Sequence, residues 1–339
     1  MGEGFRLGYA SAPDPVAIPK APMLPRNDDR PTSLDEMIGQ QEVIARTRIV
    51  VEGALARKVR VPHFLLSGPP GTGKTTLASI LAGMMGGTLI VTSGPVLSKV
   101  PSLTGLLMSA NGATVLFVDE IHRMTSPVEE VLYEALEDGT LSVITGSGQS
   151  ARPVRISLPP LLVVGATTKP GALSTPLRDR FGVHLVMQPY TLEEITAIVV
   201  RSWQRALRTF GDDWDEAGAI VSGAAKGVPR LALHLASRVL DVAAIHGADI
   251  SPVIVRQALG AFGVDESGLD EVDQAILRLL CVTFKGRPVG LEALAQALDV
   301  DKATIAAEHE GPLVRAGLMV RTPQGRMATP TAYELVRAL

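Results

Sequence analysis

The sequence is poor in the residues on which several classes of protein depend. It has one cysteine, Cys281, so no disulfide can form within the chain, as is usual for proteins of a reducing compartment. Because Cys281 follows an apolar run, it is expected to be a small buried core residue rather than a reactive thiol. Aromatic residues make up only 4% of the chain, which leaves few rings on which bases could stack.

Long apolar runs and an excess of positive charge are also missing. No stretch of about 18 apolar residues occurs, so no membrane-spanning helix is expected. The first residues lack the basic and apolar segments of a secretory signal. These absences predict a soluble, cytoplasmic protein with no membrane partner. Because the formal net charge is −3, any contact with nucleic acid must come from a local basic patch.

The most informative stretch that is present reads GPPGTGKT, at residues 68–75. It matches the P-loop pattern G-x-x-x-x-G-K-[S/T] at every fixed position. A short strand is predicted before it, over 63–67, and a helix after it. Glycines such as Gly71 and Gly73 let backbone N–H groups point at phosphate oxygens, and the helix N-terminus adds the positive end of its dipole. A glycine-rich turn that happens to precede a helix is the alternative.

Two side chains at the end of this loop have predicted roles in nucleotide chemistry. With ATP or ADP as the expected nucleotide, Lys74 is expected to reach the β- and γ-phosphates, and the Thr75 hydroxyl to complete the coordination shell of Mg²⁺. A buried strand at 114–118 then ends in Asp119 and Glu120, the form of a Walker B segment. Asp119 is expected to hold Mg²⁺ through its water shell, and Glu120 to orient and deprotonate the attacking water.

A further strand, at 160–165, leads to Thr168, which is either a polar sensor beside the γ-phosphate or a simple strand-end cap. Strands that alternate with helices predict a parallel sheet covered on both faces, with the ligand at the carboxyl ends of the strands. The P-loop, the acidic pair and Thr168 should therefore meet at one edge.

Phosphoryl transfer also needs positive charge where the transition state becomes negative, and an arginine finger is worth about 10³–10⁵ in rate. Arg178 and Arg180 are the candidates. They are expected to lie beyond the last strand, too far along the chain to curl back, so donation to a neighbouring subunit is inferred. Arg230, at the start of a later helix, is expected to contact the nucleotide of its own subunit. For each arginine a surface salt bridge is the alternative.

The order of the predicted elements divides the chain into four parts. Residues 1–29 contain five prolines and no hydrophobic periodicity, which indicates a flexible segment. A large ATPase domain is predicted over 30–189 and a small helical domain over 190–264, which opens with a capping box at Thr191. Three helices and a β-hairpin over 265–339 predict a winged helix.

Two hairpins are candidate contact surfaces. The one at 141–158 is as compatible with an ordinary surface hairpin as with one that docks on a partner. The wing hairpin carries Arg321 and Arg326, and residues 311–333 contain three arginines and no acid. These features favour contact with DNA, although a winged helix that binds protein is the alternative.

Nine segments resemble the RuvB family of bacterial Holliday-junction branch-migration motors. The resemblance runs from about Arg30 to the C-terminus, and the segments read RPTSLDEMIGQ, GPPGTGKTTLA, VTSGPVL, VLFVDEIHR, VEEVLYEALED, LPPLLVVGATT, TPLRDRFGV, PVGLEALA and RTPQGRMAT. It implies an AAA+ ATPase domain, a helical lid domain and a winged-helix head. It also implies a homo-hexameric ring on duplex DNA at Holliday junctions, a RuvA-like junction-binding partner and, indirectly, a RuvC-like resolvase, all serving recombination and DNA repair.

The resemblance adds roles for individual residues. In that family the hairpin at 141–158 docks on RuvA, Arg180 is the finger that acts on the neighbouring subunit, and Arg321 and Arg326 contact DNA. The expected catalytic residues are Lys74, Asp119, Glu120, Thr168 and Arg180. The expected nucleotide contacts are Arg30, Gly71, Gly73, Lys74, Thr75, Thr76, Glu137, Asp138, Tyr190 and Arg230.

The sequence departs from the family pattern at several positions. Thr72 stands where leucine is usual, Lys169 and Gln324 each replace an arginine, and Gly139 replaces an aromatic residue. The helix after Arg230 lacks the usual arginine cluster. Fewer cations should weaken DNA binding and flatten its salt dependence.

Three functions remain open from the sequence. The first is an ATP-driven DNA translocase for branch migration, and the second an AAA+ ATPase that loads or remodels a protein partner. The third, a nucleotide switch that binds DNA without hydrolysis, is disfavoured by the intact Asp119, Glu120 and Arg180. DNA stimulation of ATP hydrolysis would distinguish the first two.

Overall fold

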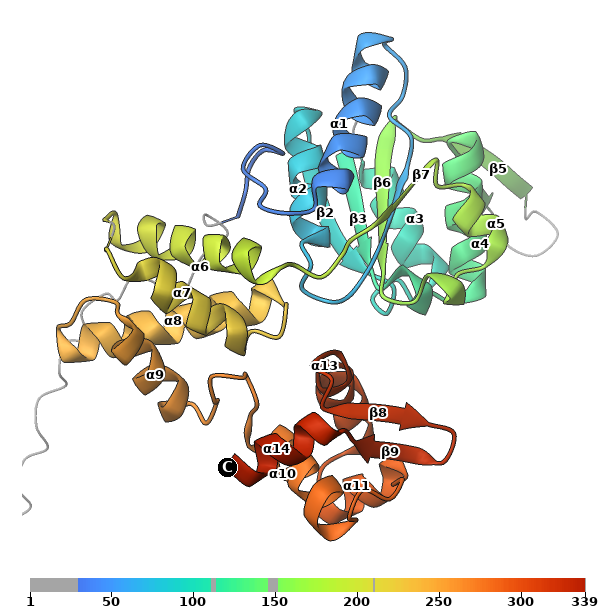
Figure 1. Ribbon diagram of the computed structural model, residues 1–339. Coiled ribbons are helices and arrows are strands. Elements are labelled where there is room, and N and C mark those ends of the chain that lie inside the picture. Colours follow the sequence, from blue (N-terminus) through green and yellow to red (C-terminus); the bar gives the residue numbers. More distant parts are fainter. Residues whose placement is uncertain (1–29, 111–113, 146–151, 210, 339) are drawn as a thin grey trace, which may run out of the picture.

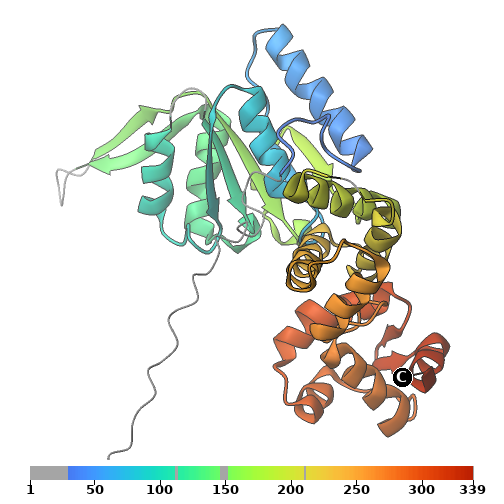
Figure 2. The same cartoon turned by 90° about the vertical axis from the view of Figure 1, so that its left-hand side faces the viewer.

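The computed structural model describes residues 30–110, 114–145, 152–209 and 211–338 (Figure 1 and Figure 2). The predicted flexible segment 1–29 and the tip of the first hairpin lie outside these ranges. A domain built on a parallel sheet comes first, followed by a four-helix domain and a part that carries the second hairpin; from here on they are called the ATPase domain, the lid and the head, after their predicted roles. No helix among the described residues is long and apolar enough to cross a membrane.

The ATPase domain is built on a five-stranded parallel sheet with the order β2-β3-β6-β1-β7. In the central strands, the side chains on both faces of the sheet are apolar. Both faces are covered by helices, as is typical of parallel sheets. The strands are β1 (Phe64–Ser67), β2 (Thr88–Ser93), β3 (Thr114–Asp119), β6 (Leu161–Thr167) and β7 (Val183–Val186).

The two faces of the sheet bury separate cores. Val115 and Phe117 of β3 pack into one core with α1 and α2, while Leu116 and Val118 pack into the other with α3, α4 and α5. This alternation follows from the two-residue period of a strand. The helices are α1 (Gln41–Ala56), α2 (Lys74–Met84), α3 (Val100–Ser109), α4 (Ser126–Asp138) and α5 (Thr175–Asp179), with short 3-10 turns η2 (Ile121–Arg123) and η4 (Pro170–Ala172).

One expectation about the arginines is wrong. Arg178 and Arg180 do not lie beyond the last strand, because β7 follows them and pairs in parallel with β1. A strand of four residues in which two are exposed lacks the continuous apolar run by which the other strands were recognised. The two arginines therefore lie in and just after α5, between β6 and β7.

The predicted hairpin at 141–158 is present. Its arms are β4 (Thr140–Thr145) and β5 (Arg152–Ser157), paired antiparallel in a separate two-stranded sheet. In both views the hairpin projects from the side of the ATPase domain that is remote from the lid and the head.

The lid is a helical layer with its own core. Trp203 is fully buried, packs edge-to-face on Trp214 with ring centroids 6.0 Å apart, and donates its indole N–H to Ala236 O at 3.1 Å. The predicted capping box at Thr191 and Glu194 is present. The helices are α6 (Leu192–Leu207), α7 (Trp214–Ala224), α8 (Pro229–His246) and α9 (Pro252–Ala261).

The head combines short helices with the second hairpin, as expected for a winged helix. Cys281 is buried in its core, as predicted. The helical segments are α10 (Glu271–Arg278), η5 (Leu279–Thr283), α11 (Leu291–Leu298), α12 (Lys302–Thr304), η6 (Ile305–His309), α13 (Glu310–Arg315) and α14 (Pro330–Ala338). The hairpin strands are β8 (Met319–Thr322) and β9 (Gly325–Ala328).

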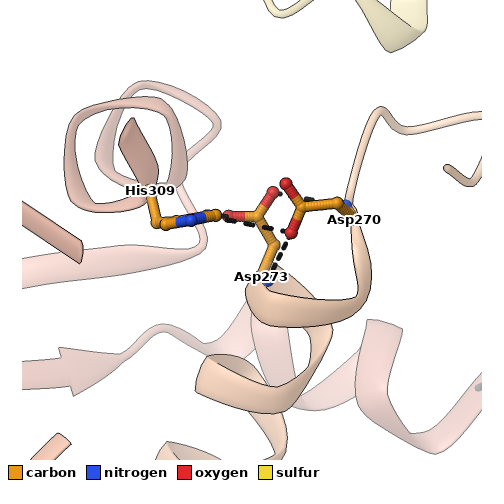
Figure 3. A group of neighbouring side chains, drawn as sticks. All are labelled: Asp270, Asp273 and His309. Atoms are coloured by element: carbon orange, nitrogen blue, oxygen red, sulfur yellow. Dashed lines mark hydrogen bonds and ion pairs between the residues drawn. The ribbon is translucent and has the colours of Figure 1, made fainter. Parts of the chain in front are cut away.

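An ionic cluster of Asp270, Asp273 and His309 lies in the head, at the start of α10 (Figure 3). Asp273 is fully buried at the start of α10, and its carboxylate lies 2.8 Å from His309 Nδ1 and accepts a hydrogen bond from Lys226, the lid residue between α7 and α8. Asp270 caps α10 and lies 3.7 Å from the same histidine nitrogen. The Lys226 ammonium thus places a positive charge of the lid beside Asp273 of the head and links the two domains.

Candidate nucleotide site

A cavity of about 540 Å³ opens between the P-loop, the segment before α1 and the lid. It collects nearly all residues that the sequence predicts to bind or hydrolyse ATP. From this set the lining includes Arg30, Gly71, Gly73, Lys74, Thr75, Thr76, Asp119, Glu120, Thr168, Tyr190 and Arg230.

The P-loop places a buried lysine at the floor of this cavity. Lys74 is the first residue of α2 and donates hydrogen bonds to Gly68 O at 3.0 Å and Pro69 O at 2.7 Å. Burial lowers the pKa of its ammonium, while Asp119 and Glu120 oppose that shift. The ammonium thus belongs to the same charged cluster as the acidic pair, at the N-terminus of a helix where phosphate groups bind readily.

The lid touches the P-loop directly. Gly71 has φ +77°, and a Cβ at this position would lie 2.7 Å from Val228 Cγ1 of the segment that leads into α8. Glycine is therefore required here both by the backbone conformation and by the close approach of the lid. Arg230, two residues further on, is brought into the cavity by the same segment.

Tyr190 forms a second contact between the lid and the P-loop. It lies just before α6, and its hydroxyl donates to Thr72 O at 3.2 Å. Burial is the main cause that raises the pKa of this phenol to about 12, so the group stays protonated and remains a donor. Close by, Gln40 accepts from Gln188 N at 3.0 Å and donates to Gln188 O at 2.6 Å, which fixes the chain where it leaves the sheet for the lid.

The acidic pair lies at the end of β3, as the sequence predicts. Asp119 accepts a hydrogen bond from Glu120 N at 2.9 Å, and Thr168 Oγ1 lies 3.4 Å from Glu120 Oε1. The backbone of Glu120 is left-handed, with φ +47° and ψ +41°, a conformation that costs a non-glycine residue about 1–2 kcal/mol. Such strain at a side chain that faces a cavity is common at functional sites.

The oxygen atoms of this site suit a hard divalent cation. The Thr75 hydroxyl and the Asp119 carboxylate both line the cavity, and hydroxyl, carboxylate and water oxygens are the ligands that Mg²⁺ prefers. The residues present therefore fit the metal that phosphoryl transfer requires.

Three predicted residues lie outside this chain's own cavity. Arg180 donates to Tyr133 Oη at 2.5 Å, pairs with Glu137 at 2.9 Å, and places its guanidinium 4.7 Å from the Tyr133 ring centre. Its hydrogen bond with Tyr133 is the largest cause that raises the pKa of Arg180. Asp138 pairs with Arg155 of β5. The structure thus groups Glu137, Asp138 and Arg180 on the α4–α5 side of the domain.

The two wing arginines share one buried acid. Glu310 is only 3% exposed and accepts from Arg321 Nε at 2.6 Å and from Arg326 Nε at 2.9 Å and Nη2 at 3.0 Å. Arg321 nevertheless keeps 60% of its side chain exposed, against 24% for Arg326. Glu310 directly precedes residues 311–333, the range in which the sequence analysis found arginines and no acid. Its pairing with the two wing arginines was therefore not predicted.

Several other lining residues have no signal in the sequence. They come from the segment before α1 and from the lid helices, and their place in the cavity depends on how the lid folds back over the P-loop. They are Pro31, Met37, Ile38, Ile198, Arg201, Ser202, Arg205, Pro229, Leu233 and His234. Their apolar members suit the flat faces of a nucleobase, and their cations suit the charge of a nucleotide.

Comparison with known proteins identifies the family. Residues 29–187 match the model of the Holliday junction DNA helicase RuvB P-loop domain, and residues 266–337 match that of the RuvB C-terminal winged helix domain.

Relatives and solved structures agree with these matches. The RuvB subunit of the Holliday junction branch migration complex from Kosmotoga olearia is 44% identical over 90% of this chain and 88% of its own, and that from Fusobacterium nucleatum is 43% identical over 90% and 91%. The solved Thermotoga maritima RuvB branch migration motor superimposes with a TM-score of 0.79 at 40% identity, over 91% of this chain and 98% of that one.

The P-loop and the acidic pair at the end of β3 lie within the first of these matches, and the head with its β-hairpin lies within the second. The chain is a P-loop ATP hydrolase with the AAA+ fold, and it belongs to the RuvB family.

Proposed function

We propose that this protein is the ATP-driven subunit of a hexameric ring that moves duplex DNA through Holliday junctions during recombination and repair. The observation that carries the proposal is the cavity where the P-loop, Asp119, Glu120 and Thr168 meet Arg230 of the lid. A nucleotide held there touches both the sheet and the lid, so its hydrolysis changes what holds the two together. This is the coupling that a motor needs.

Each residue of the cavity has a defined task in this proposal. Backbone N–H groups around Gly71 and Gly73 and the ammonium of Lys74 bind phosphate oxygens, and Glu120 takes the proton of the attacking water. Thr168 hydrogen bonds to the γ-phosphate or to that water. Thr75 and Asp119 would hold Mg²⁺, which neutralises charge on the phosphates when it is bound.

Arg180 acts on a neighbouring subunit in this proposal. Its pairing with Tyr133 and Glu137 on the α4–α5 side, away from its own cavity, supports donation to the next site in a ring. Glu137 and Asp138, which lie on the same side, would then reach the nucleotide only from across the interface.

Two surfaces serve the proposed partners. The hairpin β4–β5 docks on a RuvA-like junction-binding protein, which is supported by its projection away from the lid and the 43% exposure of Val154. The wing arginines contact phosphates of the duplex, and Arg321 is the better placed because most of its side chain is exposed. A RuvC-like resolvase would act on the same junction without a direct contact that can be assigned to this chain.

The decisive experiment measures the ATPase rate with and without duplex and four-way-junction DNA, in the presence and absence of a RuvA protein. Strong stimulation by the junction, lost in the double variant Arg321→Ala/Arg326→Ala, is expected. ATP turnover that is indifferent to DNA would contradict the proposal.

A mixing experiment tests the shared site. Lys74→Ala subunits cannot bind phosphate productively, and Arg180→Ala subunits lack the finger, so each variant alone should be inactive. A mixture should regain part of the activity, because an Arg180 from one subunit can serve an intact P-loop in another. A mixture that stays inactive would show that the site is not shared.

A second function is favoured by one observation. Because the buried Glu310 neutralises part of the charge of both wing arginines, the head presents less free positive charge than its sequence suggests. This suits a head that docks on protein, in an ATPase that loads or remodels a protein partner. In that case the Arg321→Ala/Arg326→Ala variant would hydrolyse ATP like the wild type whether or not DNA is present.

A further inference from the structure

Glu120 occupies a backbone conformation that its own side chain does not favour. It is the residue between β3 and the 3-10 turn η2, and it is one of the described non-glycine residues with positive φ. The left-handed turn reverses the chain at the end of the strand and leaves the carboxylate at the cavity rather than in the core. Something in the surroundings must hold this conformation.

Gly94 provides one half of that support. It follows β2, the strand next to β3, and its N–H donates to Asp119 O at 2.7 Å. A Cβ at Gly94 would lie 2.3 Å from Glu120 O and 3.1 Å from Met124 N. No other residue type fits so close to that backbone, so the glycine of the VTSGP segment makes room for the turn at Glu120.

His122 provides the other half, at the side chain. Its ring is 8% exposed, and Nε2 lies 3.4 Å from Glu120 Oε2. On the far side of the ring, Nδ1 lies 2.9 Å from Oγ1 of Thr167, a fully buried residue at the end of β6. The histidine therefore bridges the catalytic carboxylate and a fixed point in the core of the sheet.

The acceptor character of Glu120 favours one orientation of the ring's N–H. An ionised carboxylate can only accept, so a neutral imidazole whose Nε2 faces it at 3.4 Å is best placed there with its proton on Nε2. Its Nδ1 is then an acceptor, and Thr167 Oγ1, which accepts from Lys169 N at 2.9 Å, still has its hydroxyl hydrogen to donate to it. On the other side of the carboxylate, Thr168 Oγ1 lies 3.4 Å from the second oxygen.

We propose that His122, anchored by Thr167, and Gly94 are positioning residues that hold the Glu120 carboxylate in line for ATP hydrolysis. The inference rests on the proposed role of Glu120 as the base. Neither residue needs to touch the nucleotide: Gly94 shapes the backbone under Glu120, and His122 fixes the rotation of its carboxylate. A base displaced by a fraction of an ångström loses rate although substrate binding is unchanged.

The test compares steady-state ATPase constants of His122→Phe and His122→Gln with those of the wild type. Phenylalanine keeps the ring but removes both nitrogens, whereas the glutamine amide keeps an N–H donor for Glu120. His122→Phe should lower kcat by about 10- to 100-fold and leave the KM for ATP within about twofold, and His122→Gln should recover most of that loss. The exposed His246, at the end of α8, gives the matched control His246→Phe, which should behave as wild type.

Gly94→Ala tests the backbone half of the inference. It should bind ATP and lose turnover, since the added methyl displaces Glu120 and not the P-loop. The matched control is Gly105→Ala on α3, where a Cβ meets nothing within 4 Å. Nucleotide affinity and unfolding temperature are measured for both variants, so that a misfolded Gly94→Ala protein is recognised. If Gly94→Ala is misfolded, the His122 variants alone test the inference.

Two results would overturn the inference. His122→Phe with a kcat within twofold of wild type would show that Glu120 needs no such support. Equal losses in His122→Phe and His122→Gln, accompanied by a lower unfolding temperature in both, would show that His122 serves only packing. Glu120→Gln is measured in parallel: if it still turns over ATP, the proposed function itself fails, a result distinct from failure of His122 alone.

Discussion

Two histidines of this protein lie beside carboxylates, one in the ATPase domain and one in the head, and the two sites differ in how fully the acid is satisfied. Asp273 is fully buried, lies 2.8 Å from His309 Nδ1, and pairs with Lys226. Glu120 keeps 34% of its side chain exposed, and its neighbours His122 and Thr168 each lie 3.4 Å away.

The difference agrees with the role proposed for each acid. The Asp273 carboxylate is fully buried among short contacts and has no access to a reacting water, so it serves the fold. The Glu120 carboxylate is positioned by its neighbours but stays partly exposed at the cavity, as the proposed general base requires. We expect substitutions at the two sites to separate activity from stability.

Glu120→Gln should have the largest effect, and on activity alone. Loss of a general base lowers kcat by about 10²–10⁴-fold, while the neutral amide keeps the contacts with His122 and Thr168. ATP affinity and the unfolding temperature should remain near those of the wild type. Single-turnover hydrolysis together with a nucleotide-binding titration measures both. If Glu120→Gln lost as much stability as Asp273→Ala, the proposed difference between a catalytic acid and a structural acid would be contradicted.

Asp273→Ala should show the reverse pattern. It leaves Lys226 and His309 without their shared partner and removes half of the α10 capping box, and breaking a buried ion pair in this way costs about 3–5 kcal/mol. Denaturant unfolding gives the free energy, and kcat is compared at a temperature where both proteins are folded. Asp270→Ala is the matched control. It loses mainly the helix cap and should cost about 1 kcal/mol.

A third histidine, His63, extends the comparison because no carboxylate among the described residues pairs with it. Its Nδ1 accepts from Val163 N at 3.0 Å, and burial, aided by the charge of Arg60, lowers its pKa to about 4. Between pH 6.5 and about 4 the unfolded chain therefore binds a proton more readily than the folded one. The free energy of unfolding should fall as the pH is lowered through this window, by up to about 3 kcal/mol.

His63→Asn provides the control for that pH dependence. The asparagine can accept the same hydrogen bond from Val163 but does not titrate, so the difference between the two unfolding curves isolates His63 from His122 and His309. Parallel curves for the two proteins would mean that His63 is as easily protonated in the folded state as in the unfolded chain.

The smallest effect is expected at the wing. Arg321→Ala removes an exposed cation, and the slope of log K for DNA against log salt should become shallower by about one. The unfolding free energy should hardly change. Arg326 provides the contrast, because it makes two hydrogen bonds to the buried Glu310. Arg326→Ala should lower the stability of the head by about 1–3 kcal/mol. Equal stability in both variants would show that Glu310 does not depend on either arginine.

The sequence predicts the local parts of the site well. The P-loop and the Asp119–Glu120 pair are contiguous patterns, and the chemistry of each follows from a few neighbouring residues. Contacts between residues that lie far apart in the sequence could not be predicted in the same way. The support of Glu120 by Gly94 and Thr167 needs the strand order β2-β3-β6, and the apolar end of the cavity needs the lid to fold back.

Two omissions had different causes. The strand β7 is only four residues long and His184 interrupts its apolar run, so it was not recognised without its partner β1. For α4, in contrast, the signals were present but not used: Pro127 in its first turn and Gly139 directly after its last residue mark its two ends.

The buried Glu310, which both wing arginines share, bears on how the head would release DNA. Glu310 pairs with the guanidinium groups of both Arg321 and Arg326. In the proposed contact with DNA, a phosphate that approaches these groups would therefore exchange with a carboxylate and would not fill an empty binding site. Such an exchange yields a smaller net free energy per contact and makes each contact easier to break. A motor that moves along DNA in the proposed way has to release each phosphate as readily as it binds the next, and a carboxylate that competes for the same arginines favours that release.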